Sequence, residues 1–215
     1  MNSPTYRFIP EMFRRVMRGE KTQTRRVMVP QPLTAWTQDP YAEDLFEITP
    51  GKRITVSELL LLSPYGPTGT VKPCVTTWAV AKEWDAIAPG IMDPAVVLAE
   101  HSVWFNDLDT PKPDWAGKTR PAMFFPQQLY PYAPQLVCRA VKAERVQDIS
   151  DADVIAEGVS GILVIPLSAQ PYYRPFERPG EHQRAFRKLW DSINARRGYG
   201  WDVNPFVFAT TFERQ

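Results

Sequence analysis

Residues 19–27 read Gly-Glu-Lys-Thr-Gln-Thr-Arg-Arg-Val, and this stretch decides the fold because it separates a helix from a strand. Before it, Pro10 suits the first helical position, an apolar i, i+3, i+4 pattern starts at Phe13, and Gly19 offers an end. Threonine and valine then favour extended backbone. We therefore expect a helix between Pro10 and Gly19, followed directly by an extended segment over Glu20–Val27.

The composition is that of a folded protein with balanced charge. Of the 215 residues, 44% are hydrophobic, which is enough for one large domain with a real core. The 25 Lys and Arg against 24 Asp and Glu give a formal net charge of +1, which excludes a globally basic nucleic-acid coat and an acidic tail protein. The 22 prolines are about twice the usual share, so we expect long irregular segments.

Local signals predict the other elements. Ser150 caps a short helix that Gly158 ends, and a longer amphipathic helix is expected over Glu181–Arg197. The apolar stripe of that longer helix consists of Ala185, Phe186, Leu189, Trp190 and Ile193. The expected strands are Ala95–Phe105, Leu136–Val146 and Phe206–Phe212. Residues 28–50 are assigned to loop, residues 62–95 carry little regular pattern, and Arg53–Leu61 is either a strand or a short helix.

Basic residues are concentrated near the N-terminus. Six of them lie within 13 positions, opposed there only by Glu20: Arg14, Arg15, Arg18, Lys21, Arg25 and Arg26. A one-sided field of this kind suits phosphate or nucleotide binding. The alternative is that the first three form the solvated face of the first helix.

Three further groups of residues are candidates for a functional site. Lys21 and Thr24 converge only if Lys21 still belongs to the turn before the strand, where a desolvated amine beside a hydroxyl can act as a general base; a polar turn with β-forming threonines is the alternative. Glu157 ends a helix, where the dipole disfavours a carboxylate, so either function or simple exposure explains it. The loop at residues 196–205 holds Trp201 and Asn204, which either form a stacking surface for a base or belong to the core.

Three blocks in order resemble the ASCH domain family, in its phage and prophage branch. The first is Phe8–Phe13 followed by Gly-Glu-Lys-Thr-Gln-Thr-Arg-Arg, and the second is Val-Gln-Asp-Ile-Ser running into Ala-Glu-Gly-Val at residues 146–159. The third is the Phe-x-x-Leu-Trp-Asp-Ser-Ile-Asn helix with the later Gly-Tyr-Gly-Trp, before the last strand. Together the blocks cover about half of the chain.

The resemblance implies an α+β fold, a PUA-like mixed β-barrel with flanking helices and long Pro-rich insertions. It implies a single domain over residues 1–215, with insertions at about 28–52 and 62–134. Small bacterial members of the family remove the acetyl group from N4-acetylcytidine. Carried over by position, Lys21 is the expected general base, Thr24 the nucleophile or water-positioning hydroxyl, and Glu157 the acid–base partner. The expected substrate-binding residues are Thr22, Arg25, Arg26, Trp201 and Asn204.

One segment departs from the family pattern. Where the phage branch has an Arg-Glu pair, this chain has Val75 and Thr76, and Pro73 would disturb a central strand. If that pair lines the pocket in relatives, this protein has lost charged ligand contacts. It then binds a different ligand, or binds without turnover.

The expected partner is therefore a nucleoside, a nucleotide or RNA. The alternatives to a hydrolase are a non-catalytic PUA-like RNA- or nucleotide-binding module and a phage accessory protein that binds a protein through its Pro- and Trp-rich insertions. No apolar run reaches the roughly 20 residues of a membrane span, so we expect a cytoplasmic protein, in the bacterial host if phage-encoded, and no membrane partner. Cys74 and Cys138, with only two histidines, make no metal-site pattern and are expected to be reduced thiols. No metal or cofactor is expected.

Overall fold

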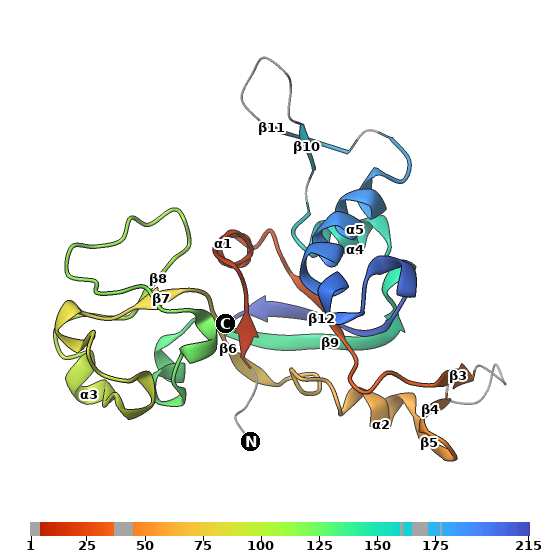
Figure 1. Cartoon of the computed structure of the whole chain (residues 1–215), viewed down its shortest axis with the longest axis horizontal. Helices are drawn as coiled ribbons and strands as arrows, with labels where there is room; N and C mark the ends of the chain where they lie inside the picture. Colours follow the sequence, from red (N-terminus) through yellow and green to blue (C-terminus); the bar gives the residue numbers. More distant parts are fainter. Residues whose placement is uncertain (1–4, 37–44, 160, 165–171, 177) are drawn as a thin grey trace. The chain divides into compact units, whose positions relative to one another are not determined.

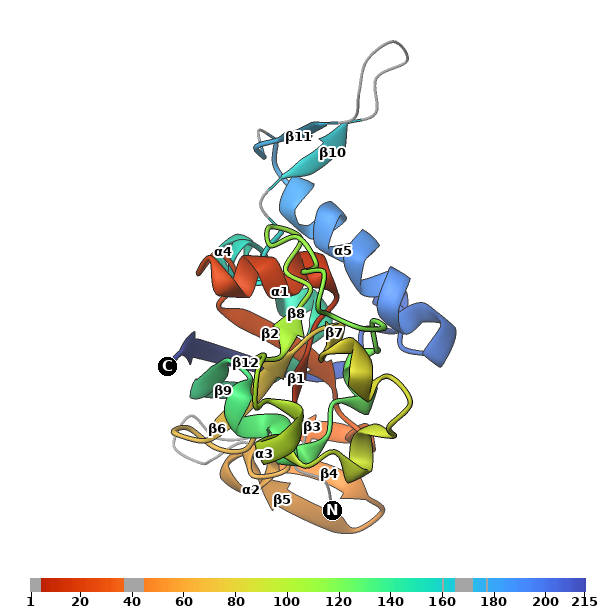
Figure 2. The same ribbon diagram turned by 90° about the vertical axis from the view of Figure 1, so that its left-hand side faces the viewer.

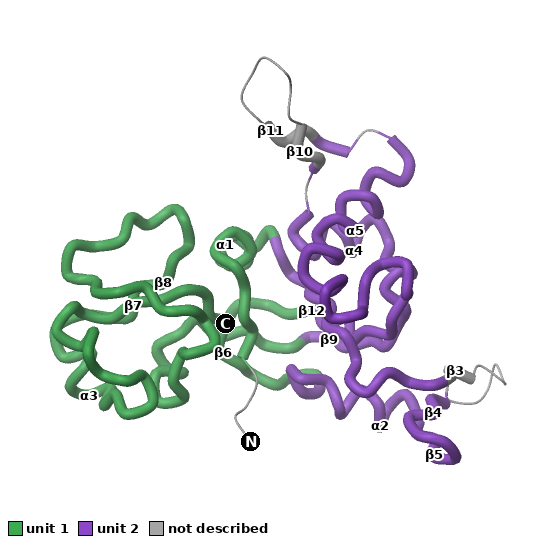
Figure 3. The backbone as a smooth tube through the Cα atoms, in the orientation of Figure 1, with its two compact units in different colours: residues 1–20, 68–138, 212–215 green, residues 21–67, 139–211 purple. Residues whose placement is uncertain are grey.

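The chain divides into two compact units, which are described separately. The computed structural model describes residues 5–36, 45–159, 161–164, 172–176 and 178–215. Unit 1 comprises Met1–Glu20, Thr68–Cys138 and Phe212–Gln215, and unit 2 comprises Lys21–Pro67 and Arg139–Thr211 (Figure 3). The expected insertion at 62–134 thus falls mainly in unit 1, whereas the one at 28–52 falls in unit 2. That the whole chain is one ASCH-type domain stays a prediction.

Unit 1 combines short strands with short helices. Its strands are β1 (Tyr6–Arg7), β6 (Val71–Val75), β7 (Trp78–Ala79), β8 (Trp104–Phe105) and the start of β9 (Gln135–Arg145), and the end of β12 (Phe206–Arg214) also belongs to it. Its helices are α1 (Pro10–Met17), α3 (Pro94–Val97) and the 3₁₀ helices η1 (Lys82–Trp84), η2 (Pro89–Ile91), η3 (Ala122–Phe124) and η4 (Gln127–Tyr132). β6 lies parallel to β1 and antiparallel to β9, and a core around Trp78 and Leu129 fills the unit.

Unit 2 contains the longest helix and the last strand (Figure 1). Its strands are β2 (Gln23–Val27), β3 (Thr34–Trp36), β4 (Leu45–Thr49), β5 (Lys52–Thr55), β10 (Ile162–Val164), β11 (Tyr172–Arg174), the rest of β9 and most of β12. Its helices are α2 (Val56–Leu60), α4 (Asp151–Ala156), α5 (Glu181–Asn194) and the 3₁₀ helices η5 (Val146–Asp148), η6 (Ala195–Arg197) and η7 (Trp201–Val203). β12 lies between β9 and β2, and α4 packs against both α5 and β2 (Figures 1 and 2).

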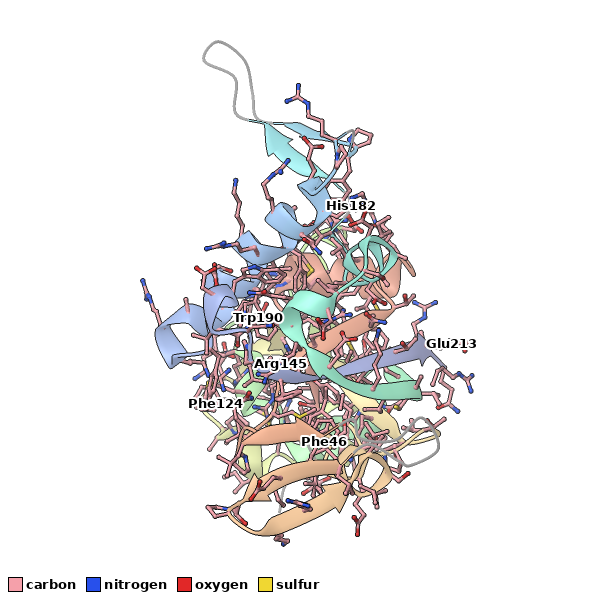
Figure 4. The ribbon with its side chains drawn as sticks, turned by 90° about the vertical axis from the view of Figure 1, so that its right-hand side faces the viewer. Phe46, Phe124, Arg145, His182, Trp190 and Glu213 are labelled. Atoms are coloured by element: carbon pink, nitrogen blue, oxygen red, sulfur yellow. The ribbon has the colours of Figure 1, made fainter. Side chains whose placement is uncertain are left out.

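Two apolar clusters hold unit 2 together. Phe186 and Trp190 of α5 pack with Trp201 in the first cluster. The apolar stripe expected for α5 is therefore largely confirmed, although its last member, Ile193, is 51% exposed. Phe46 of β4 meets Phe206 edge to face, with ring centroids 5.6 Å apart. Figure 4 shows Trp190 on α5 and Phe46 on β4. Burial of such aromatic side chains contributes a large share of the stability of a core.

The elements with clear end signals are confirmed. α1 and β2 lie where the opening stretch predicts them, α4 begins after the capping box of Ser150, and β9 and β12 match the expected strands within two residues. Cys74 and Cys138 are buried thiols that form no disulfide bond with described residues.

Other expectations were wrong or had left two structures open. Residues 28–50 contain β3 and β4 in addition to loop, and residues 37–44 lie outside the described part of the chain. Residues 53–61 hold both candidate structures, the end of β5 and then α2, because Thr55 and Glu58 form a capping box at the junction. The strand expected over Ala95–Phe105 is mostly absent: the Asp93 side chain caps α3 and Pro94 opens it, so capping overrides the β-forming valines.

Pro73 does not prevent strand formation. It lies within β6, opposite Gln135 of β9, and the neighbouring Cys74 amide donates to the Pro134 carbonyl at 2.7 Å. The strand continues because adjacent residues supply the donors that proline lacks.

The class of the fold is α+β. Within the described residues the strands form several sheets and none closes into a barrel, so a PUA-like barrel stays a prediction.

Candidate active site

Lys21 and Glu157 meet in the interior of unit 2, although 136 residues separate them in the sequence. The Lys21 Nζ donates to Glu157 Oε2 at 2.7 Å and to the Glu157 backbone carbonyl at 2.7 Å. Both residues are only 4% exposed. The structure therefore joins two of the three expected catalytic residues in a buried ion pair.

The local backbone explains this meeting. The strand β2 begins at Gln23, so Lys21 and Thr22 precede it, and Lys21 reaches the same Glu157 carboxylate as Arg25, on the side of the chain opposite to Thr24. The Thr22 amide donates to the Ala156 carbonyl at 2.8 Å and ties the start of β2 to the end of α4. Glu157 is the C-terminal cap of α4, and Gly158 adopts φ 84°, where a residue with a Cβ is strained.

Burial changes the proton affinity of Lys21. Desolvation is the dominant cause and lowers the pKa of Lys21 from its ordinary value, while the charge and hydrogen bond of Glu157 act in the opposite direction. The positive charges of Arg26 and Arg25 lower the pKa further. An amine in this setting releases its proton more readily than a surface lysine, which is what a general base requires.

Arg25 occupies the second oxygen of Glu157. Its Nη1 donates to Glu157 Oε1 at 3.3 Å and to Gln23 Oε1 at 2.6 Å, and its Nε donates to Glu144 Oε1 at 2.8 Å. Its Nη2 lies 2.7 Å from the same Glu144 oxygen and 3.2 Å from Asp153 Oδ2. The Arg25 side chain is 0% exposed. Glu157 is therefore held between two cations, one on each carboxylate oxygen.

Asp153 is a further carboxylate in contact with Arg25, and it also contacts Lys142. Burial acts to raise its pKa, but hydrogen bonds from Gln23, Ser150 and Lys142, together with the charge of Arg25, outweigh it and hold the pKa of Asp153 well below its usual range. Lys142 Nζ lies 3.2 Å from Asp153 and 2.9 Å from Glu144. Three cations thus face three carboxylates in this network: Lys21, Arg25 and Lys142 against Glu144, Asp153 and Glu157.

Thr24 is also buried, at 2% exposure. Because side chains alternate along a strand, Thr24 projects from the face of β2 opposite to Gln23 and Arg25. In the register with β12 it pairs with Thr210, whose fully buried hydroxyl has no hydrogen-bond partner among the described residues. The role of Thr24 at a reacting group stays a prediction.

The remaining expected substrate-binding residues occupy different surroundings. The Thr22 side chain is exposed. Arg26 is half-buried and its Nε donates to the Tyr65 hydroxyl at 2.7 Å. Trp201 is 8% exposed and meets Phe186 edge to face, so it packs in the core.

Asn204 has a backbone role. Its φ of 49° places it in the left-handed region at the end of η7. Its side-chain oxygen accepts from the Gln147 amide at 3.0 Å, and its carbonyl accepts from Arg145 Nη1 at 2.9 Å. Arg145, labelled in Figure 4 at the end of β9, also covers the Phe206 ring at 3.7 Å. That Trp201 or Asn204 contacts a substrate stays a prediction.

The arginines of α1, in unit 1, are neutralised locally. Arg14 and Arg15 pair with Glu11, one turn earlier on the same helix. Arg18 forms a two-pronged pair with Asp109, whose oxygens lie 2.8 and 3.0 Å from its guanidinium nitrogens. This agrees with the solvated-face alternative for the helix more than with an open anion site.

Sequence reasoning missed most of the network around the ion pair. Lys142 and Glu144 are two apart in β9, so a period-2 pattern places them on one face and could have identified them. Asp153 lies in the helix that Ser150 caps, and its place in the sequence gives it no other role. In unit 1, Val75 and Thr76, which replace the charged pair of the phage branch, are both fully buried.

Comparisons with known proteins identify no relative: no family model, no curated protein and no solved structure matches this chain. Among the described residues, no cluster of histidine, cysteine and carboxylate side chains is arranged to hold a metal ion. In the same part of the chain, no helix has both the length and the apolar character to cross a membrane.

Proposed function

We propose that this protein is an amidohydrolase that cleaves an exocyclic amide on a modified pyrimidine nucleoside, with N4-acetylcytidine as the representative substrate. The observation that carries the proposal is the buried contact of Lys21 Nζ with Glu157 Oε2 at 2.7 Å. A buried ion pair is weak support for stability, because apolar residues of similar volume often replace it without loss. A perturbed, buried lysine beside a carboxylate is a typical feature of a catalytic site.

The chemistry assigns one role to each residue. Neutral Lys21 accepts the proton of the Thr24 hydroxyl or of a water molecule that Thr24 positions, and the oxygen attacks the amide carbonyl carbon. Glu157, in contact with Lys21, then relays the proton that Lys21 accepted to the exocyclic nitrogen as the C–N bond breaks. The products are acetate and cytidine, and any acyl-enzyme is released by one water molecule, so that one water is consumed in all.

The two other functions have less support. A binding module that uses the basic cluster requires accessible cations, but Arg14, Arg15 and Arg18 are paired with carboxylates. A protein-binding role for the insertions predicts exposed tryptophans at 84, 104 and 115, whereas Trp104 is 9% exposed in an apolar cluster and Trp84 and Trp115 are half-buried. We therefore retain the hydrolase alone.

The test is hydrolysis of N4-acetylcytidine, with release of cytidine followed by chromatography. Wild-type protein should turn over, and Lys21→Ala, Thr24→Ala and Glu157→Gln should each lower kcat by about 100-fold or more, as loss of an acid–base group does. Lys118→Ala, on the surface of unit 1, is the matched control and should behave as wild type. Absence of cytidine with wild-type protein, or full activity of Lys21→Ala, would overturn the proposal.

A further inference from the structure

The structure points to Arg25 as a positioning residue that acts through Glu157, and this inference rests on the proposed hydrolase. The resemblance places Arg25 among the residues that hold substrate. We infer instead that Arg25 fixes the orientation of the Glu157 carboxylate and shares its negative charge with Lys21, without touching the substrate.

The contacts of Arg25 carry the first step. Its side chain is 0% exposed, against 3% for Lys21 and 5% for Glu157, so its contacts rather than its burial set it apart from the reacting groups. The guanidinium is committed to Glu144, Gln23 and Glu157 by hydrogen bonds of 2.6–3.3 Å. A planar fork that bridges several acceptors at once is a geometry that lysine does not reproduce.

The division of the Glu157 carboxylate carries the second step. Oε2 faces Lys21 at 2.7 Å, and Oε1 faces Arg25 at 3.3 Å. With both oxygens engaged, the carboxylate cannot rotate without breaking one contact. Because Arg25 takes part of the charge of Glu157 and repels the Lys21 ammonium, it favours the neutral amine.

The other charges around Lys21 do not reverse this effect. The charged groups that pair within this network or act on Lys21 are Arg25 and Arg26 on β2, Asp153 and the cap residue Glu157 on α4, and Lys142 and Glu144 on β9. Arg26 adds to the repulsion of the ammonium. Glu144 and Asp153 hold Arg25, while Lys142 bonds to both carboxylates from the more exposed side of the network. Removal of the Arg25 charge should therefore strengthen proton binding by Lys21.

The experiment compares Arg25→Lys and Arg25→Met with wild-type protein. The first readout is the pH profile of kcat for N4-acetylcytidine. In Arg25→Met, kcat at pH 7 should fall by about 100-fold, as it does when a reacting group is misplaced, with KM unchanged and the rise of kcat shifted to higher pH. In Arg25→Lys the charge remains, so the rise should stay near its wild-type pH while kcat is still lowered by loss of the fork.

The second readout does not need turnover. The Lys21 side-chain NMR signal, assigned with Lys21→Met, should titrate at higher pH in Arg25→Met than in wild type and at nearly the wild-type pH in Arg25→Lys. If wild type fails to hydrolyse N4-acetylcytidine, the proposed function fails, and this titration still decides the role of Arg25.

Three results would overturn the inference. A raised KM with unchanged kcat would make Arg25 a substrate-binding residue. Equal Lys21 titration in Arg25→Met and wild type would separate Arg25 from the base. If Arg25→Met does not fold, a displaced Lys21 titration in Arg25→Lys would contradict the expected effect of retained charge.

Discussion

Glu157→Gln tests whether the ion pair is as buried as its geometry indicates. The substitution takes the carboxylate away from the buried Lys21 ammonium, while the backbone carbonyl of residue 157 still accepts from it. Arg25 keeps Glu144 and therefore adds little to the cost. In the variant, Lys21 avoids carrying a buried charge without its carboxylate by releasing its proton on folding.

The free-energy cost of this deprotonation sets how much stability the variant loses. The ordinary pKa of lysine is 10.5, so deprotonation at pH 7 costs about 1.36 kcal/mol for each of about 3.5 units, or about 5 kcal/mol. Removal of one partner from a buried pair typically costs about 3–5 kcal/mol. We therefore expect Glu157→Gln to lose about 3–5 kcal/mol of unfolding free energy at pH 7.

The pH dependence supplies a second check. In the variant, Lys21 is neutral when folded and protonated when unfolded, so the unfolded state binds more protons and stability rises with pH below 10.5. Wild-type Lys21 keeps Glu157, which raises its pKa, and therefore gains less. The difference in unfolding free energy between wild type and Glu157→Gln should therefore decrease from pH 7 to pH 9, by up to about 1.4 kcal/mol per pH unit.

Urea denaturation followed by far-UV circular dichroism and tryptophan fluorescence measures both quantities. Lys21→Met alone should cost less than Glu157→Gln, because Arg25 still faces Glu157 Oε1. The double variant should recover most of the loss. A Glu157→Gln protein within about 1 kcal/mol of wild type, the range of an exposed pair, or a gap that does not change with pH, would refute the reasoning.

Three smaller effects follow from neighbouring residues. Ser150→Ala should lower the unfolding free energy by about 1 kcal/mol and also lower activity, because Ser150 caps the helix that ends at Glu157. Thr55→Ala, at the capping box of α2, should lower stability in thermal unfolding by a similar amount and leave activity intact. Equal activities of the two variants would contradict this. Thr210→Val removes an unpartnered hydroxyl and should stabilise by about 1 kcal/mol, while Thr211→Val, which loses a bond from a glutamine, should not; a destabilised Thr210→Val would be the contrary result. Asp153 has a lowered folded pKa, so its stabilising contribution is present above about pH 4 and is lost as pH falls further; acid titration of stability in Asp153→Asn should converge with wild type at low pH, and a gap that persists there would exclude this role.

The local signals of the sequence determined the helices that begin and end with cap residues. Ser150 and Gly158 bound α4, and Pro10 and Gly19 bound α1, because a cap satisfies backbone groups within three or four positions of itself. The run of aromatic and β-branched residues at 206–212 identified β12, because β-propensity is also a property of neighbouring residues in the sequence. The strand β6 was not recognised, because it contains Pro73 and forms between chain segments that lie far apart in the sequence.

For the site, the sequence by itself supplied residue types, and the resemblance selected Lys21, Thr24 and Glu157. The tertiary structure decided the rest. It placed the amine against the carboxylate, buried both, and put Arg25, which the resemblance gave as a substrate-binding residue, in contact with Glu157 in the interior. Proton affinity and ion pairing depend on desolvation and on charges within a few ångströms, and residues 136 positions apart acquire those neighbours only when the chain folds.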